Sequence, residues 1–321
     1  MSTTVCLVTP APPRSRKGNR VTALRWARIL RDLGRRVRVL QEYRGERCDL
    51  LIALHALHSA PSVERYRSAH PDAPLVLALT GTDLYGAIRT HPEARRALDL
   101  ATRLIVLQPL GVAELPHRVR ERARVIYQSV PAPRNTDGRG AARHDRFEVC
   151  VLGHLRPVKD PFRTALAARL LPPASRLSVL HLGAALQEEM AEQARAEVVV
   201  NPRYRWLGEV PRWRALRLLG RCRLLVLTSE LEGGANAISE ALAASVPVLS
   251  SRIAGSVGLL GADYPGYFPV GDTAALARLL GRAETDEDFY RALHDWCARL
   301  RPLVDPARER QSWAELLREL G

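Results

Sequence analysis

The sequence predicts an α/β fold of two domains, each built on a parallel sheet with helices on both faces. Short, near-continuous apolar runs alternate with amphipathic helical patterns from end to end, which is typical of such sheets. The segment Val130–Arg146 breaks this alternation with Pro, Asn, Asp, Gly and charged residues, as a linker does. A length of 321 residues suits two domains of ordinary size.

Strands are expected on both sides of this break, each as a short β-rich run. In the first half they are Thr4–Thr9, Arg36–Leu40, Asp49–Leu54, Leu75–Leu79, Leu104–Leu107 and Arg124–Tyr127. In the second half they are Phe147–Leu152, Leu177–Gly183, Arg205–Leu207, Leu224–Thr228, Val246–Ser250 and Tyr267–Val270. The first helix is predicted over Asn19–Gly34, with Asn19 as its N-cap and Gly34 as its terminator.

These elements predict two Rossmann-like domains that face each other across a cleft. We expect the N-terminal domain over residues 1–130, a linker over 131–146 and the C-terminal domain over 147–302. Residues 303–321 hold a last helix, roughly Ala307–Leu320, which we expect to pack back on the first domain.

The net charge of +14 is compatible with a nucleic-acid partner. Nucleic-acid binders concentrate basic residues in one stripe and interleave aromatic ones. Here arginines are spread over both halves and aromatic residues make up only 5%, which disfavours that class. The two lysines, Lys17 and Lys159, instead fall in short loops between a predicted strand and a predicted helix, where an anion would bind.

Membrane and secretion signals are not evident in the sequence. No apolar run approaches the ~18–20 residues that span a bilayer, and Met1–Thr9 is a predicted strand rather than a signal peptide. The five cysteines are widely scattered, which favours buried thiols in a reducing cytoplasm over disulfides. We therefore expect a cytoplasmic protein without stable membrane association.

Common cofactor and metal motifs are missing or poorly placed. Neither GxGxxG nor GxxxxGK[ST] occurs in the sequence. Asp286-Glu287-Asp288 has the form of a metal-binding DxD, but it opens an amphipathic helix, where acidic residues complement the helix dipole. His55 and His58 have metal-like spacing without a nearby third ligand. We expect no metal and no cofactor.

The most informative segment is Thr228–Val248, TSELEGGANAISEALAASVPV. A strand ends, a tight loop with two glycines follows, and a helix begins near Asn236. Glycines let the backbone approach a ligand closely, and the N–H groups of a helix start attract a diphosphate. Glu240, one turn into the helix, would accept hydrogen bonds from ribose hydroxyls. The alternative is an ordinary strand–helix turn with a solvated glutamate.

This segment resembles the E-x7-E signature of the family 4 retaining glycosyltransferases, here Glu232 to Glu240. The resemblance implies a GT-B fold, with the first glutamate on the donor sugar and the second on the nucleotide ribose. Ser245 departs from the family pattern, which has glycine after the helix.

A second match, Gly153–Lys159, resembles the family's G-R-L-x-x-x-K loop, which holds the donor diphosphate. Lys159 occupies the lysine position, whereas His154 replaces the arginine and leaves Arg156 to compensate. The alternative is that Arg156-Pro157 starts the next helix.

Candidate acceptor-binding residues lie in the N-terminal half of the sequence. Pro10–Arg20 is a basic loop at a helix start, which suits a free anion, with a solvated loop as the alternative. Thr80–Asp83 resembles the family's H-G-x-D segment, with threonine in place of histidine. His55 and His58 follow a strand that ends at the same cleft, and a core or capping role is the alternative for them.

Several stretches resemble a narrower group, the selenosugar synthases of selenoneine biosynthesis. They are Ser15–Leu30, Ala78–Tyr85, Gly153–Arg163, Glu232–Ala241 and Ser251–Thr273. The resemblance implies transfer of N-acetylglucosamine or glucose from its UDP ester to selenophosphate, with loss of phosphate.

Three sets of site residues follow from these resemblances. The catalytic candidates are Lys159, Glu232 and His55. The donor candidates are Gly153, His154, Arg156, Lys159, Glu232, Gly233, Gly234, Ala235, Asn236, Ala237 and Glu240. The acceptor candidates are Ser15, Arg16, Lys17, Gly18, Asn19, Thr80 and Thr82.

Other functions stay open at this point. A conventional family 4 enzyme would share every donor motif and use an alcohol or a phosphorylated small molecule as acceptor. A UDP-sugar epimerase on the same fold would need no second substrate. A nucleic-acid-binding protein would explain the charge but not the pairing of Glu232 and Glu240.

Overall fold

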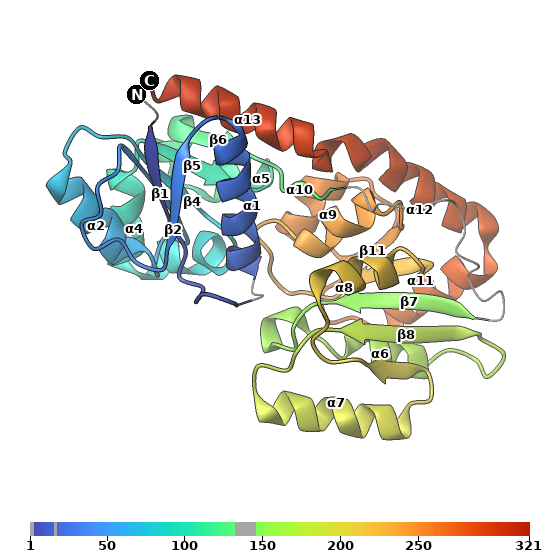
Figure 1. The fold of residues 1–321 in the computed structure, drawn as a ribbon. Helices are drawn as coiled ribbons and strands as arrows, with labels where there is room; N and C mark the ends of the chain where they lie inside the picture. Colours follow the sequence, from blue (N-terminus) through green and yellow to red (C-terminus); the bar gives the residue numbers. More distant parts are fainter. Residues whose placement is uncertain (1–2, 16–17, 132–145) are drawn as a thin grey trace. The chain divides into compact units, whose positions relative to one another are not determined.

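The protein is described by a computed structural model that covers residues 3–15, 18–131 and 146–321 (Figure 1). The chain folds into two compact units. Unit 1 comprises Met1–Gln128, Glu232–Gly234 and Pro306–Gly321, and unit 2 comprises Ser129–Leu231 and Ala235–Asp305. In the described residues each unit holds one six-stranded sheet, and its strand pairs are parallel. The predicted α/β class is therefore confirmed.

Unit 1 alternates strands and helices as the sequence predicts. Its strands are β1 (Thr4–Val8), β2 (Arg36–Leu40), β3 (Leu50–Leu54), β4 (Leu75–Ala78), β5 (Arg103–Val106) and β6 (Ala123–Val125). Its helices are α1 (Gly18–Asp32), α2 (Ala60–Ala69), π-helix η1 (Asp83–Ala87), α3 (Ile88–Thr90), α4 (Pro92–Leu100), α5 (Leu110–Glu114), 3-10 helix η2 (His117–Arg122) and α13 (Pro306–Glu319).

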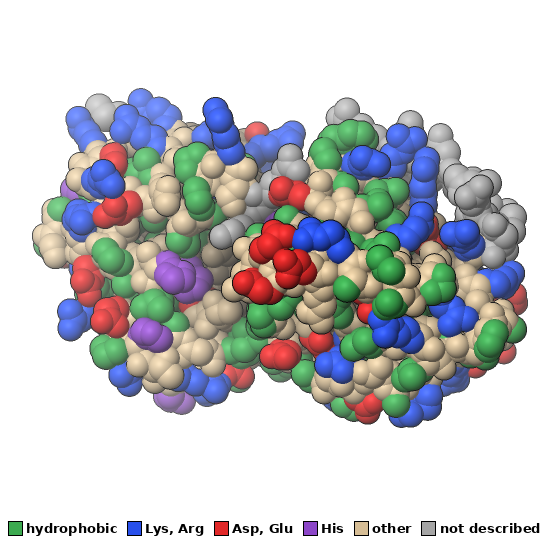
Figure 2. All heavy atoms as spheres, turned by 90° about the horizontal axis from the view of Figure 1, so that it is seen from below, with side chains coloured by type: hydrophobic (Ala, Val, Ile, Leu, Met, Phe, Trp, Pro, Cys, Tyr) green, Lys and Arg blue, Asp and Glu red, His purple; other side chains and the backbone are tan. Residues whose placement is uncertain are grey.

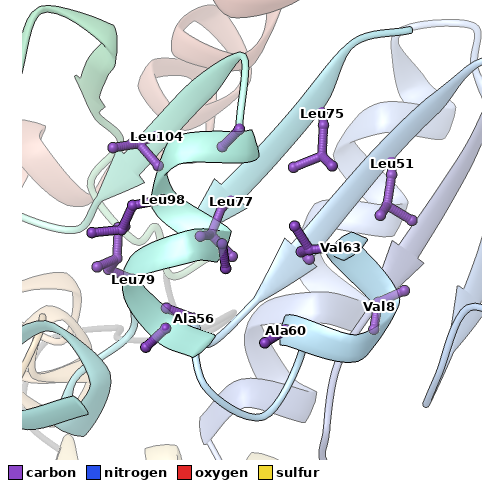
Figure 3. Close-up of a cluster of buried hydrophobic side chains, with 14 of the residues drawn as sticks. Val8, Leu51, Ala56, Ala60, Val63, Leu75, Leu77, Leu79, Leu98 and Leu104 are labelled. Carbon is purple, nitrogen blue, oxygen red and sulfur yellow. The ribbon is translucent and has the colours of Figure 1, made fainter. Parts of the chain in front are cut away.

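The sheet of unit 1 has the order β2-β1-β3-β4-β5-β6. Side chains alternate between its two faces, and both faces are covered. On β1, Cys6 and Val8 belong to one core cluster, whereas Val5 and Leu7 belong to the other. Figure 3 shows the first cluster, in which strand leucines such as Leu77 meet side chains of α2 and α4 such as Val63. Burial on both faces explains why the inner strands β1, β3 and β4 have near-continuous apolar sequences.

Helix α13 completes the second core cluster by packing against α1. The rings of Trp26 and Trp313 meet edge to face with centroids 5.0 Å apart. Glu309, only 1% exposed, accepts from Trp26 Nε1 at 2.7 Å and pairs with Arg25 Nε at 2.9 Å. The C-terminal helix thus belongs structurally to unit 1, although it follows unit 2 in the chain.

Unit 2 repeats the alternation. Its strands are β7 (Phe147–Leu152), β8 (Leu177–Leu182), β9 (Tyr204–Trp206), β10 (Leu224–Leu227), β11 (Val248–Ser251) and β12 (Tyr267–Phe268), in the order β12-β11-β10-β7-β8-β9. Its helices are η3 (Pro157–Lys159), α6 (Arg163–Arg169), α7 (Glu188–Val200), α8 (Arg212–Leu219), α9 (Asn236–Ala243), α10 (Ala254–Leu260), α11 (Thr273–Thr285), α12 (Glu287–Leu300) and η4 (Arg301–Val304).

Each predicted strand is present, with ends that differ by at most two residues. The strand expected from Val246 begins at Val248, because Val246 N donates to Ala241 O and Pro247 has no N–H. The strand expected to reach Val270 ends at Phe268, before Pro269, at an edge of the sheet.

The first helix corrects one prediction and confirms another. Asn19 is not the N-cap, because α1 already begins at Gly18 and Asn19 lies inside its first turn. Gly34 does end this helix region, with φ of +80° and its N–H bonded to Arg31 O. Of the expected linker 131–146, residues 132–145 lie outside the described part of the chain.

The cysteines are free and buried, as predicted; they are Cys6, Cys48, Cys150, Cys222 and Cys297. Within the described residues, no helix is long and apolar enough to cross a membrane.

On one face of the molecule the basic side chains are distributed rather than gathered. On the face drawn in Figure 2, Lys and Arg side chains lie at separate places on the surface, with acidic and apolar side chains between them. This face therefore shows no single basic stripe of the kind that nucleic-acid binders present.

Candidate functional site

The strand order of unit 2 creates a switch point beside β7. The chain runs from β7 to β8 and β9 on one side, and then returns to place β10 on the other side. In open parallel sheets, ligands bind outside the carboxyl ends of the strands at such a point. The loops that leave β7 and β10 are those of the two predicted donor motifs, Gly153–Lys159 and Thr228–Asn236.

Direct hydrogen bonds join these two loops. Glu230 N donates to Val158 O at 2.9 Å. The Thr228 hydroxyl lies 2.9 Å from Lys159 O and 2.8 Å from the carbonyl of Asp160. The structure thus brings the two donor motifs, far apart in the sequence, to one edge of the sheet.

The start of the first motif is held by residues of β8 and the loop after it. A Cβ on Gly183 would lie 1.9 Å from Gly153 O, so only glycine allows this approach. His181 Nε2 lies 3.2 Å from the same carbonyl, while its Nδ1 lies 2.9 Å from the Tyr204 hydroxyl. Burial lowers the pKa of His181 to about 4, so this support is a neutral imidazole with Nε2 as donor.

His154, which replaces the family's arginine, has a backbone partner. Its Nδ1 accepts from Ala184 N at 3.1 Å. Arg156 is exposed and extended before Pro157, the first residue of the short helix η3. Arg156 thus precedes a 3-10 turn that ends at Lys159, a position compatible with either role considered for it.

Lys159 is half-buried and is followed by a left-handed residue, Asp160, with φ of +43°. Asp160 accepts from Arg163 Nε at 2.6 Å, and Arg163 also donates to the Thr273 hydroxyl at 2.7 Å. These contacts, with those of Thr228, fix the backbone on both sides of the lysine.

The second motif supplies the start of α9. Helix α9 begins at Asn236, as predicted, and its other residues are buried. The Oδ1 atom of Asn236 is buried without a hydrogen-bond partner, so a polar atom at this helix start is available to a ligand. Ala235 and Ala237 are buried beside it. Ser245, where the family has glycine, has φ of +57°, a conformation that glycine adopts without strain.

The two glutamates differ in their surroundings. Glu240 is 7% exposed by its side chain, and its Oε1 pairs with Arg212 Nη1 at 2.5 Å. Glu232 is half-buried and groups with unit 1, together with Gly233 and Gly234. A Cβ on Gly233 would lie 2.5 Å from the carbonyl carbon of Thr80, so the backbone approach requires glycine there.

Unit 1 has its own switch point, between β1 and β3. The chain leaves β1 for β2 on one side and returns with β3 on the other. The loops at the carboxyl ends of these two strands contain the predicted basic loop and His55 with His58.

His55 is buried and has φ of +75°, a conformation that costs a non-glycine residue energy and is frequent at functional sites. Its ring stacks on His58 with centroids 4.2 Å apart. Nδ1 accepts from His58 N at 3.3 Å, and Nε2 lies 3.2 Å from Thr82 Oγ1. Burial lowers the pKa of His55, which favours a neutral ring that donates through Nε2.

Asp83 braces the loops around His55. Its fully buried carboxylate accepts from Ala56 N at 2.9 Å, Thr80 N at 3.0 Å and Gly81 N at 2.8 Å. Thr80 and Thr82 are thereby held next to the loop after β3. A π-helix begins at Asp83, and such irregular turns are frequent at functional sites.

The basic loop is described only in part. Ser15 closes a turn by donating its N–H to Pro12 O at 3.1 Å, and Gly18 and Asn19 lie in the first turn of α1. Arg16 and Lys17 lie outside the described residues.

The acidic triplet is a helix cap, as the helix-dipole interpretation predicts. Asp286 is the N-cap of α12 and accepts from Phe289 N at 2.9 Å, while Asp288 pairs with Arg291. Over residues 3–15, 18–131 and 146–321, no cluster of three or more His, Cys, Asp or Glu side chains is arranged to hold a metal ion.

Three supporting residues were not among the sequence-based predictions: His181, Thr228 as a loop tie, and Arg212. His181 could have been identified from the sequence, because it is a lone histidine inside the apolar strand Leu177–Leu182. The other two act through contacts between segments that no local pattern reveals.

The fold is a two-unit α/β fold, and the loops after β7 and β10 meet at the carboxyl edge of one sheet, where a ligand would bind. The family model for glycosyl transferases group 1 matches residues 134–296, and the chain belongs to this family. A search of curated proteins finds no match.

Solved structures support the fold. HepE from Anabaena, determined in complex with UDP-glucose, has a TM-score of 0.80 at 16% identity, covering 99% of this chain and 100% of that one. Sucrose-phosphate synthase from Thermosynechococcus elongatus has a TM-score of 0.77 at 17% identity, covering 99% of each chain. Trehalose-phosphate synthase from Burkholderia xenovorans, in complex with glucose-6-phosphate, has a TM-score of 0.69 at 14% identity, covering 84% of this chain and 73% of that one. The fold is GT-B.

Proposed function

We propose that this glycosyltransferase takes a hexosyl group, N-acetylglucosamine or glucose, from a UDP-sugar and transfers it to selenophosphate. The observation that carries the donor half of the proposal is the hydrogen-bonded meeting of the loops after β7 and β10. Similar structures determined in complex with UDP and with UDP-glucose support the same donor class.

The donor roles follow from charge and position. Lys159 and the first N–H groups of α9 bind the diphosphate, and Asn236 Oδ1 can accept a hydrogen bond from a hydroxyl of the UDP-sugar. Gly153, His154 and Arg156 line the same loop. Glu240 accepts from the ribose hydroxyls, and Glu232 contacts the sugar beside Gly233 and Gly234. Unit 2 is then the nucleotide-binding unit, and unit 1 the acceptor unit.

The chemistry requires a nucleophile and a stabilised leaving group. Selenium of selenophosphate forms a bond to the anomeric carbon while that carbon's bond to the UDP oxygen breaks. Lys159 and the helix start take up the charge that develops on UDP, which is the electrostatic contribution expected to dominate. Water then cleaves the P–Se bond, releasing phosphate and the 1-seleno sugar.

Selenophosphate as acceptor is supported by the resemblance to the selenosugar synthases and by the basic loop that holds Ser15, Arg16, Lys17, Gly18 and Asn19. Thr82 supplies a hydroxyl beside His55, and Thr80 is held in the same segment by Asp83. Selenium is already a strong nucleophile, so no dedicated base is required. The neutral His55 instead donates a hydrogen bond to the acceptor or the leaving group.

A phosphorylated sugar is the second candidate acceptor. It is favoured by the likeness to a sucrose-phosphate synthase and to a trehalose-phosphate synthase bound to glucose-6-phosphate. Such an acceptor is also a phosphate-bearing anion and suits the same basic loop.

Product analysis separates these proposals. Purified protein is incubated with UDP-N-acetylglucosamine or UDP-glucose and, in parallel, with selenophosphate or glucose-6-phosphate, without added metal. A sugar product with the selenium isotope pattern supports the first proposal. A disaccharide phosphate together with UDP supports the second proposal. Both proposals are contradicted if UDP is released and neither selenophosphate nor glucose-6-phosphate, present as acceptor, gives a sugar product.

A further inference from the structure

Helix α8 (Arg212–Leu219) brings one arginine to the buried glutamate of α9. Arg212 Nη1 lies 2.5 Å from Glu240 Oε1, and the two side chains are 40% and 7% exposed. The arginine therefore reaches the carboxylate from the solvent side, at the margin of the proposed donor site. It comes from the segment after β9, which none of the sequence motifs includes.

The attachment of α8 does not depend on this ion pair. The helix buries Ala215 and Leu219 on its inner face. Trp213 and Arg214, next to Arg212, are exposed. The contact is thus made by one side chain at the first position of the helix, and its immediate neighbours remain in solvent.

The ion pair with Arg212 restricts the orientation of the Glu240 carboxylate. A glutamate side chain rotates about three bonds, and a buried carboxylate is costly without a partner. The planar guanidinium fixes the direction of the carboxylate group by a charge-assisted hydrogen bond. A carboxylate has about four lone-pair positions, so it can accept from an arginine and from a diol together.

We propose that Arg212 is a positioning residue for nucleotide recognition: it holds the carboxylate of Glu240 in the direction in which it accepts from the two ribose hydroxyls. The inference rests on the proposed function, because it assigns a second residue to the same ribose contact. Its consequence is specificity. Arg212 strengthens binding of ribonucleotides and has little effect on nucleotides that lack the ribose hydroxyls.

The test compares the dissociation constants of UDP and 2′,3′-dideoxy-UDP by calorimetry. Arg212→Ala is expected to weaken UDP binding about tenfold and dideoxy-UDP binding less than twofold. Arg212→Lys, which keeps the charge but not the planar fork, is expected to fall between Arg212→Ala and the unchanged protein. Arg214→Ala removes the same charge from an exposed position two residues away, and should leave both constants unchanged.

A double-mutant cycle tests whether Arg212 acts through Glu240. In a Glu240→Gln protein, adding Arg212→Ala should weaken UDP binding less than twofold. Thermal unfolding of each variant shows whether it remains folded at the temperature of the titration.

Distinct results overturn the two ideas. If the unchanged protein binds no UDP, the proposed function fails. If it binds UDP in preference to the dideoxy analogue and Arg212→Ala keeps that preference, the inference about Arg212 fails alone. The inference also fails if Arg212→Ala weakens the binding of UDP and of dideoxy-UDP equally. It fails too if Arg212→Ala weakens UDP binding as much in the Glu240→Gln protein as in the unchanged protein.

Discussion

Glu230 donates its backbone N–H to the carbonyl of Val158 at 2.9 Å, joining the loop after β10 to the loop after β7. Each loop carries one of the anion-binding elements of the proposed donor site: Lys159 in one and the start of α9 in the other. Because the two loops are hydrogen-bonded, disturbing either one should displace the other.

Replacement of the lysine in the first loop should lower both turnover and the affinity for UDP. Lys159→Ala is expected to lower kcat about 10²-fold, because it removes a cation from the leaving UDP. The measurement is the rate of UDP release from UDP-N-acetylglucosamine with acceptor present. Arg221→Ala, which removes an exposed cation of the same unit, is the matched control. Equal loss in both variants would contradict a specific role for Lys159.

A side-chain hydroxyl, that of Thr228, adds a second tie between the two loops. Thr228→Val keeps the shape of a buried side chain but leaves the carbonyls of Lys159 and Asp160 without that donor. We expect a loss of about 1–3 kcal/mol in unfolding free energy and weaker binding of UDP, measured by urea unfolding and calorimetry.

Thr164→Val is the control for this substitution, because Thr164 is equally buried and its hydroxyl has no partner. It should be neutral or stabilising and leave UDP binding unchanged. If Thr228→Val and Thr164→Val had the same unfolding free energy and the same affinity for UDP, the Thr228 hydroxyl would have no importance for the loops.

The close approach of Gly183 to Gly153 gives a steric prediction. Gly183→Ala forces a Cβ against Gly153 O, so the first donor loop must shift, and UDP binding should fall at least tenfold. Gly281→Ala, inside helix α11 with only an ordinary 3.5 Å neighbour, should gain about 0.5–1 kcal/mol of stability. Wild-type binding by Gly183→Ala would contradict the geometry of this loop.

The stability of the fold should depend on pH through His181. Burial lowers its pKa to about 4, so the unfolded state takes up a proton near the ordinary pKa of ~6.5 before the folded state does. The stabilisation from a neutral His181 is therefore complete above about pH 6.5 and is lost as the pH falls toward 4. It amounts to about 3 kcal/mol over that range.

His181→Gln removes this titration while keeping an amide donor. Unfolding free energies from denaturant curves at several pH values between 7.5 and 4.5 provide the measurement. The variant should be less stable at neutral pH and should lose less stability on acidification than the unchanged protein. Parallel pH profiles would show that His181 does not titrate as its burial implies.

The sequence predicted the fold because burial dictated it. Strands such as Leu50–Leu54 are covered on both faces, so each position is apolar, and the apolar run identifies the strand. The loop with Gly233 and Gly234 was identifiable because two adjacent glycines between a strand and a helix indicate a close backbone approach, which the structure shows to Thr80 and to Leu107.

Contacts between loops escaped prediction because they depend on strand order. Thr228 and Lys159 are 69 residues apart in the chain, and they meet because β10 returns beside β7. Alternation of strands and helices does not determine that order. Arg212, in an arginine-rich sequence, carried no local signal that it pairs with Glu240. The Asn19 cap was wrong because the helix begins one residue earlier.

The most direct test of the proposed donor site is a calorimetric titration of the purified protein with UDP. We expect saturable binding at one site per chain, strongly weakened by Lys159→Ala. Absence of UDP binding, or unchanged binding by a folded Lys159→Ala protein, would contradict the assignment of the β7 and β10 loops as the donor site.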